Sequence, residues 1–289
     1  MKHATAHALS ALNIVVHPHS TKGYVSMFES AMKRKQHPVR VRGDQFGIVA
    51  SCFRIKPSDE ESPLEGEMFR FTEIELGEEW FNILRLDVAN EEELKQISIP
   101  SHLRPNLKRF RYLFFPLPHR LVFETRHSSD SLPSPAAKRI VENFLSHGRD
   151  TSVSVTVEQS QEALEKMLRI DLLQYLAINV HQPNDDEGSL SERAIIEEMK
   201  KQNILSEYTE LRAEPGKSIK PNRRTQILAQ AATSNGNVAV SGRDERGRKI
   251  NEDTALHPLV EHRQKPGNQD LVGWFRNAAE EVVKKILEK

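Results

Sequence analysis

Long hydrophobic runs are absent from this sequence. Its apolar stretches, such as residues 13–16 and 112–115, fall far short of the roughly 20 residues that a membrane-spanning helix requires. Near the N-terminus, histidine interrupts the segment where a secretion signal would have an apolar core. We therefore expect no membrane span, no secretion signal and a cytoplasmic location.

Cysteine is nearly absent too. The single Cys52 excludes an internal disulfide and a cysteine-rich zinc site, which suits a reducing compartment. It lies in the apolar run 46–53, where a thiol behaves as a small buried hydrophobe, whereas a catalytic thiolate needs an electropositive setting.

Metal-binding patterns are weak. His17 and His19, with His3 and His7 upstream, could hold a divalent ion, but no carboxylate accompanies them at a recognisable spacing. Residues 184–188 lack the spaced oxygen ligands of a calcium loop. We expect no metal and no cofactor.

Familiar catalytic motifs are also missing. The chain has no glycine-rich phosphate loop after a strand, no Gly-x-Ser-x-Gly and no His-Glu-x-x-His. Arg120 and His127 have the spacing of an Arg-x6-His ribonuclease motif, but the residues between them are typical of a strand rather than of the helix that the motif requires. These absences favour a non-enzymatic protein.

Charge of one sign is not in excess, because 41 basic residues balance 41 acidic ones in a chain of 289 residues. A field of the whole molecule therefore cannot attract nucleic acid, and any anion site must be local. Three clusters of cations are candidates for phosphate contacts, with solvated surface as the alternative interpretation. They contain Lys33, Arg34, Lys35, Arg40 and Arg42; Lys108, Arg109 and Arg111; and Arg243, Arg246, Arg248 and Lys249.

The fold class that the patterns indicate is α+β, with two lobes that each contain a mainly antiparallel sheet with packed helices. The length favours two domains, and the polar, proline-containing segment 127–133 marks the best boundary, giving an N-terminal lobe at 1–130 and a C-terminal lobe at 131–289. In the first lobe, apolar alternation predicts strands in one sheet at residues 12–16, 39–42, 46–55, 67–74, 112–115 and 120–124, with a helix at 22–35.

The second lobe is predicted to alternate helices and strands. Ser134 before a proline begins a helix that ends near Gly148, and Ser189 with Glu192 forms a capping box for a helix to about residue 202. Further elements are a strand at 152–157, helices at 161–168 and 222–233, and a hairpin of 237–241 with 248–253. Residues 169–180 fit a strand or a helix, and we favour a strand because they leave no clean helical face. The periodic apolar residues from 271 to 287 predict a long C-terminal amphipathic helix, either packed on the core or paired in a dimer.

Two resemblances extend these patterns. The order of residues 170–180, the capped helix after Ser189 and segment 238–248 resembles the phage-exclusion protein RexA of lambda. The N-terminal half is similar to a bacterial family known only as a domain of unknown function, through segments 66–74, 79–81, 99–100, 105–106 and 119–124. Together the resemblances imply an anti-phage defence component that binds double-stranded DNA through its backbone as a homodimer.

Two other functions stay open at this point. One is a metal-dependent nuclease effector whose carboxylates come from distant parts of the chain. The other is an adaptor whose C-terminal helix presents Trp274 and Phe275 to a second defence-system protein.

Overall fold

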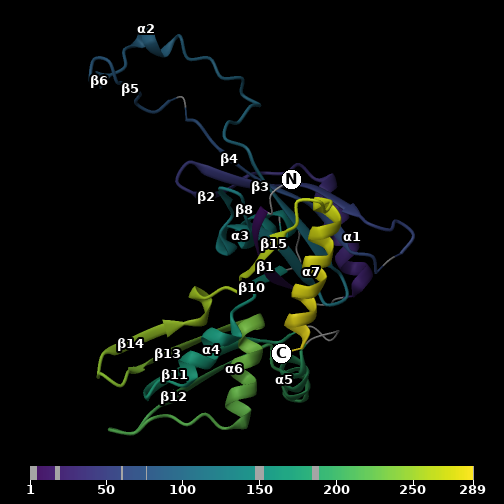
Figure 1. The fold of residues 1–289 in the computed structure, drawn as a ribbon, viewed down its shortest axis with the longest axis vertical. Helices are drawn as coiled ribbons and strands as arrows, with labels where there is room; N and C mark the ends of the chain where they lie inside the picture. The colour runs from purple at the N-terminus through teal and green to yellow at the C-terminus, as the bar shows by residue number, and fades with distance from the viewer. Residues whose placement is uncertain are drawn as a thin grey trace.

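The computed structural model describes residues 5–16, 20–59, 61–75, 77–146, 153–183 and 189–288. It confirms an α+β protein in which two antiparallel sheets carry packed helices (Figure 1). We call the larger sheet with its helices the large lobe, and the smaller sheet with its helices the small lobe. Every helix in the described part of the chain is too short or too polar to cross a membrane.

The large sheet is built around its longest strand, β1 (Thr5–Val16), whose described side chains are almost all buried. The sheet order is β10-β1-β8-β7-β4-β3-β2, and β15 also pairs with the first half of β1. The other strands are β2 (Val39–Arg42), β3 (Gln45–Arg54), β4 (Leu64–Thr72), β7 (Lys108–Phe115), β8 (Arg120–His127), β9 (Asp130–Ser131), β10 (Val153–Val157) and β15 (Glu261–Lys265). All six strands predicted in the N-terminal half thus belong to one sheet.

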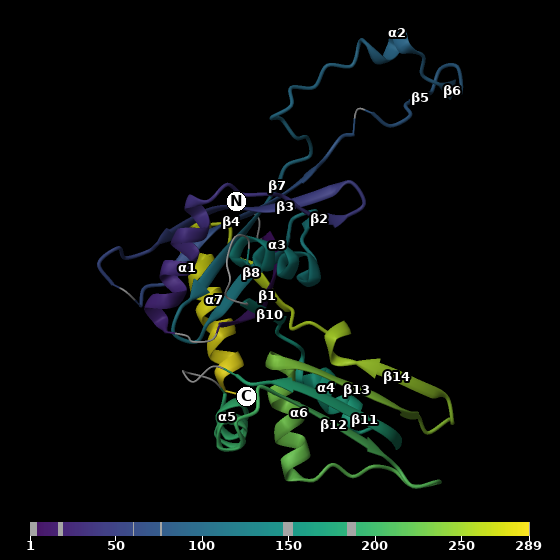
Figure 2. The ribbon, with the colours of Figure 1, turned by 180° about the vertical axis from the view of Figure 1, so that it is seen from behind.

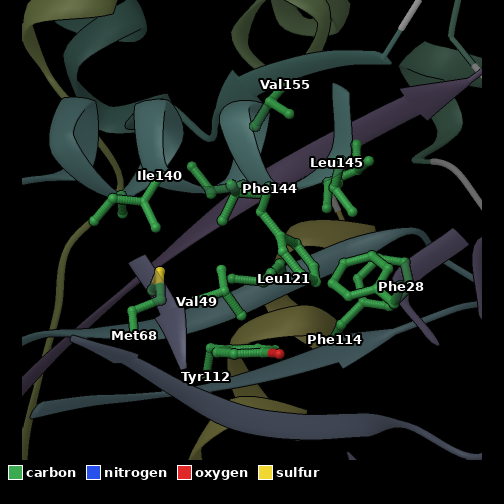
Figure 3. Packing of buried hydrophobic residues seen from close by; sticks show 14 of the residues in the cluster. Phe28, Val49, Met68, Tyr112, Phe114, Leu121, Ile140, Phe144, Leu145 and Val155 are labelled. Carbon is green, nitrogen blue, oxygen red and sulfur yellow. The ribbon is translucent and has the colours of Figure 1, made fainter. Parts of the chain in front are cut away.

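One face of the large sheet is covered by α1 (Thr21–Lys33) and α3 (Ser134–Ser146). Apolar side chains recur on one side of each helix, so burying that side against the sheet removes it from water. Figure 3 shows the result: Phe28 of α1 stacks on Phe114 of β7 with ring centroids 4.4 Å apart, and Phe144 of α3 meets Phe28 edge-on at 5.7 Å. This is the main core.

The opposite face is covered only in part, by α7 (Leu271–Leu287). The apolar stripe of α7 packs over β1, β8 and the second half of β7, burying Leu9, Leu113, Val122 and Phe275. Intramolecular packing of the C-terminal helix is therefore confirmed. Phe275 is 3% exposed, and the ring centroid of the half-buried Trp274 lies 4.6 Å from that of His7. The adaptor hypothesis stays a prediction.

The small lobe contains the sheet β12-β11-β13-β14 with helices α4, α5 and α6. The strands are β11 (Leu172–His181), β12 (Ser206–Arg212), β13 (Gly236–Arg243) and β14 (Lys249–Asp253), and the helices are α4 (Gln161–Leu168), α5 (Leu190–Gln202) and α6 (Arg223–Asn235). The capping box at Ser189 and the β13–β14 hairpin are confirmed. The 3-10 turn η1 (Thr254–Leu256) follows the hairpin.

An arm leaves the large sheet between β4 and β7 and extends far from it (Figures 1 and 2). We call residues 73–107 the arm; it holds the short hairpin of β5 (Phe81–Asn82) and β6 (Asp87–Val88), followed by α2 (Glu91–Leu94). Its base is closed, because Thr72 N donates to Pro105 O at 3.0 Å. The strands β4 and β7 therefore pair directly without it.

The chain order of the two lobes is interleaved. Elements that follow residue 131, namely α3, β10, β15 and α7, pack with the large sheet, whereas the small sheet takes its strands from residues 172 to 253. A domain division between residues 130 and 131 stays a prediction.

Candidate nucleic-acid interface

Four of the predicted cations lie on the uncovered part of the large sheet. In β2, Val39 and Val41 pack toward the main core, so Arg40 and Arg42 alternate onto the other face. In β7, Phe110 and Tyr112 are core residues, so Arg109 and Arg111 also alternate onto that other face. The strands β3 and β4 lie between β2 and β7 in the sheet.

Strand register places apolar residues between these arginines. One cross-strand row runs from Arg40 through Phe46 to Phe71, and the next runs from Arg109 through Phe69 to Ile48. Paired residues in a sheet share a face, so the six side chains form one surface. We call this surface the outer face; its members are Arg40, Arg42, Phe46, Ile48, Phe69, Phe71, Arg109 and Arg111.

Two of the arginines lie over aromatic rings. The guanidinium carbon of Arg40 is 5.2 Å from the ring centroid of Phe46, and that of Arg109 is 5.4 Å from that of Phe69. A guanidinium over a ring gains cation–π attraction while its N–H edges stay free for an anion. The sheet thus holds these cations in place at its surface.

Acidic neighbours neutralise only part of the outer face. Arg40 meets Glu75 at 3.3 Å and Arg111 meets the buried Glu124 at 3.5 Å. Within the described residues, Arg42 and Arg109 have no carboxylate partner. Glu67 also lies on this face, opposite Arg111 in the register. The free positive charge is therefore concentrated at Arg42 and Arg109.

The outer face ends in a hollow beside α7. This pocket has a volume of about 250 Å³ and is lined by Arg111 and Glu67 of the sheet, the exposed Phe53, and Val272 and Phe275 of α7. Glu65 at its edge accepts two hydrogen bonds from Arg276 of α7, at 2.8 and 2.6 Å. The helix is thereby fixed along the border of the outer face and leaves the rest of it open.

The remaining predicted cations lie elsewhere. Lys108 is two residues from Phe110 in β7, so it lies on the same side of the sheet as Phe110, away from the outer face. It pairs with Asp130 at 2.7 Å. Lys33, Arg34 and Lys35 lie at the end of α1, where Arg34 donates to the Phe144 carbonyl oxygen.

The hairpin cluster belongs to the other sheet. Arg243, Arg246, Arg248 and Lys249 lie on β13, β14 and their connection in the small lobe (Figure 1). Arg248 is paired with Asp244 at 2.7 Å, and Arg243 donates to the Gly247 carbonyl oxygen at 2.8 Å. The structure therefore brings Arg40, Arg42, Arg109 and Arg111 together but does not add the hairpin to them.

The most strongly organised charges are buried between the lobes, and the sequence patterns did not reveal them. Arg120 of β8 is fully buried, with its guanidinium 2.7 Å from Glu158 and 2.8 Å from Glu192 of α5. Asn13 accepts from Arg120 at 2.7 Å, and Asn235 of α6 donates to Glu192 at 2.6 Å. These residues are far apart in the chain, so no local spacing could indicate the cluster.

The electrostatics of this cluster hold both partners charged. Burial alone would raise the pKa of Glu192, but Arg120, the Ser189 N–H and Asn235 outweigh it and lower the pKa to about 2. Burial alone would lower the pKa of Arg120, and the attraction of Glu192 and Glu158 instead raises it. Arg120 is also the arginine of the Arg-x6-His ribonuclease spacing. Its burial in β8 places it in the junction of the lobes.

Other reactive groups are held in structural contacts. Burial raises the pKa of the Cys52 thiol to about 11, which opposes a thiolate at neutral pH. His7 is buried with its Nδ1 3.1 Å from Glu124. His3, His17, His19 and residues 184–188 lie outside the described residues. Across the part of the chain that the structure describes, no three His, Cys, Asp or Glu side chains group closely enough to hold a metal ion.

A larger hollow lies in the small lobe, and sequence reasoning missed it as well. It has a volume of about 610 Å³ between α4 and residues 250–260, and Met167, Ile170 and Leu256 line it. His257 Nε2 is 2.9 Å from Glu252 at its wall. Its lining comes from separate segments, so only the folded chain shows it.

The fold and the outer face define an α+β protein with an arginine- and phenylalanine-rich sheet surface. The chain belongs to a family described as a domain of unknown function, DUF4747, whose family model matches residues 5–281. This confirms the predicted membership of such a family. No curated protein matches the chain, and the resemblance to RexA stays a prediction.

Proposed function

We propose that this protein binds nucleic acid at the outer face, through the phosphates of the nucleic-acid backbone. Double-stranded DNA is the ligand that we propose first. The observation that carries the proposal is the grouping of Arg40, Arg42, Arg109 and Arg111 on one uncovered sheet surface. The setting that we propose, a non-enzymatic role in bacterial anti-phage defence, rests on the resemblance to RexA.

Phosphate oxygens suit the geometry of these side chains. A guanidinium presents a planar fork of N–H donors that matches two phosphate oxygens, and the rings beneath Arg40 and Arg109 reduce the freedom lost on binding. Because the formal net charge of the chain is zero, attraction at this surface must be short in range. Phosphate contacts carry no information about the base sequence, so we expect little sequence preference.

A single strand is the second candidate ligand, and the phenylalanines of the outer face favour it. Phe46, Phe69 and Phe71 are only half-buried, and unpaired bases stack on aromatic side chains exposed on a sheet. Stacking would require Arg40 and Arg109 to move off their rings. A comparison of duplex and single strand therefore separates phosphate contact from base stacking.

The test is fluorescence anisotropy with a labelled duplex and its single strand over a range of salt concentrations. The variant R40Q/R42Q/R109Q removes three charges from the outer face. Its matched control, R243Q/R246Q/K249Q, removes three from the hairpin. Each phosphate contact adds roughly 0.9 to the slope of log K against log salt, so the first variant is expected to reduce the slope by about 2–3.

The control is expected to bind like the unaltered protein. The proposal fails if the outer-face variant keeps full affinity and slope, or if the hairpin variant alone loses them. Tighter binding of the single strand, lost in F46A/F69A, assigns the stacking mode instead of the duplex.

A further inference from the structure

The arm is an insertion that the large sheet does not need for its own pairing. Its ends meet at the Thr72–Pro105 hydrogen bond, and Arg104 Nε lies 2.5 Å from Glu73 next to it. Beyond this base, both views show the arm extending away from the rest of the molecule (Figures 1 and 2). Ordering such a segment costs conformational entropy, which contacts at its base and within its tip, residues 78–94, offset in part.

The tip of the arm is a small unit held by polar contacts. Glu93 of α2 accepts hydrogen bonds from Asn82 at 2.5 Å and from Arg85 at 2.7 Å. It also closes the capping box with Asn90 at the start of α2. Asn82 Oδ1 in turn accepts from the Leu84 N–H at 2.9 Å. Asn82, Arg85 and Glu93 are thus engaged inside the tip.

The apolar side chains of the tip point into solvent. The exposed large hydrophobics are Phe81, Ile83, Leu84, Leu86 and Val88, and Leu84 is 91% exposed. Leu86 has φ of 53°, a left-handed conformation that is strained for a residue with a Cβ and that glycine would adopt freely. An apolar group concentrated in this way on a monomer surface is typical of a docking site.

Charge defines what the tip can dock on. Residues 78–94 carry six carboxylates and one arginine, so the receiving surface must be basic as well as apolar. The outer face has both properties, with four arginines around Phe46, Ile48, Phe69 and Phe71. Since the arm extends away from its own sheet, the outer face that it can reach without rearrangement belongs to another molecule (Figure 1).

We propose that the arm tip docks on the outer face of a second copy of this chain. The arm tip of that copy docks in turn on the outer face of the first, which gives a two-fold symmetric dimer. In this dimer the apolar side chains around Leu84 cover the phenylalanines of the partner, and the carboxylates of the arm meet its arginines. An exchange of identical segments satisfies both surfaces at once. The dimer stands whether or not nucleic acid binds, and if both hold, phosphates and the acidic arm compete for the same arginines.

The test uses two variants that are each defective in one half of the contact. The first replaces residues 75–103 by a short Gly-Ser turn, which the adjoining ends at Thr72 and Pro105 allow, and keeps the outer face. The second, R40E/R109E, keeps the arm but reverses the charge of the receiving surface. Light scattering coupled to size exclusion measures the mass of each protein, alone and mixed, without nucleic acid.

The expected result is a dimer for the unaltered chain, a monomer for each variant alone, and a one-to-one heterodimer when the variants are mixed. That complementation requires an arm from one molecule and an outer face from the other. A monomeric unaltered chain, a dimeric armless variant or a mixture that stays monomeric each overturns the proposal. If R40E/R109E loses its cooperative melting transition, R42Q/R109Q replaces it under the same criteria.

Discussion

The arginines of two neighbouring strands, β7 and β8, have opposite surroundings. Arg120 of β8 is fully buried between the lobes against Glu158 and Glu192, whereas Arg109 of β7 is exposed over Phe69 with no carboxylate partner among the described residues. A buried cation must be paired because it has lost its water, while an exposed one retains it. The first therefore fixes the junction of the lobes, and the second is available to a ligand.

Removal of the buried arginine is expected to have the largest effect. Arg120→Met leaves Glu158 and Glu192 without their cation, and breaking a buried pair in this way costs about 3–5 kcal/mol. Arg109→Met is the matched control and is expected to change the free energy of unfolding by less than about 0.5 kcal/mol. Urea denaturation of both variants measures the difference, and equal losses would break the comparison.

Acid should weaken the junction through Glu192. The folded-state pKa of about 2 lies below the ordinary 4.5, so the stabilisation is present above pH 4.5 and is lost as the pH falls toward 2. The full shift corresponds to about 3 kcal/mol. We expect the urea midpoint of the unaltered protein to drop between pH 5 and 3 by more than that of Glu192→Gln; parallel pH profiles would show that this carboxylate does not carry the effect.

On the exposed side, single substitutions are expected to affect binding and leave stability unchanged. Arg109→Gln removes a cation that has no acidic partner, so the salt slope of DNA binding should fall by roughly 0.9. Lys108→Gln is a fair control, because Lys108 is one residue away and paired with Asp130. If both substitutions lowered the salt slope equally, DNA binding could not be assigned to the outer face.

The last prediction concerns neither stability nor binding but the reactivity of Cys52, whose pKa burial also raises. With its pKa raised to about 11, the thiol should react with iodoacetamide at pH 8 on the order of a hundred-fold more slowly than an ordinary cysteine. Urea should restore the ordinary rate by exposing the thiol. Rapid labelling of the folded protein would contradict the burial of β3 side chains against the main core.

Local patterns were sufficient for most elements of the fold. Strict alternation identified β10, and capping residues identified α5. They did not identify β15, whose residues Glu261–Lys265 have no apolar member and form a strand only because β1 offers a free edge. Nor did they identify β12, whose side chains alternate in burial but whose sequence is rich in charge and has no apolar alternation. Pairing partners distant in the chain decide such strands.

The cations of the candidate site could likewise be placed only in part from the sequence. The alternation within β2 and β7 was sufficient to place Arg40 with Arg42 and Arg109 with Arg111, but the register through β3 and β4 was needed to bring the two pairs onto one face. The hairpin cations had equal weight in the sequence and lie on the other sheet. The composition of a segment shows how many cations it has, but only the folded structure shows which of them share a surface.

Hydrogen exchange with and without duplex DNA tests the central claim most directly, because it reports the bound segment without any substitution. The outer face predicts slower exchange at backbone amides of β2, β3, β4 and β7, with the β13–β14 hairpin unchanged. Protection confined to residues 243–249, or no protection anywhere at saturating DNA, would contradict the assignment of nucleic-acid binding to the outer face.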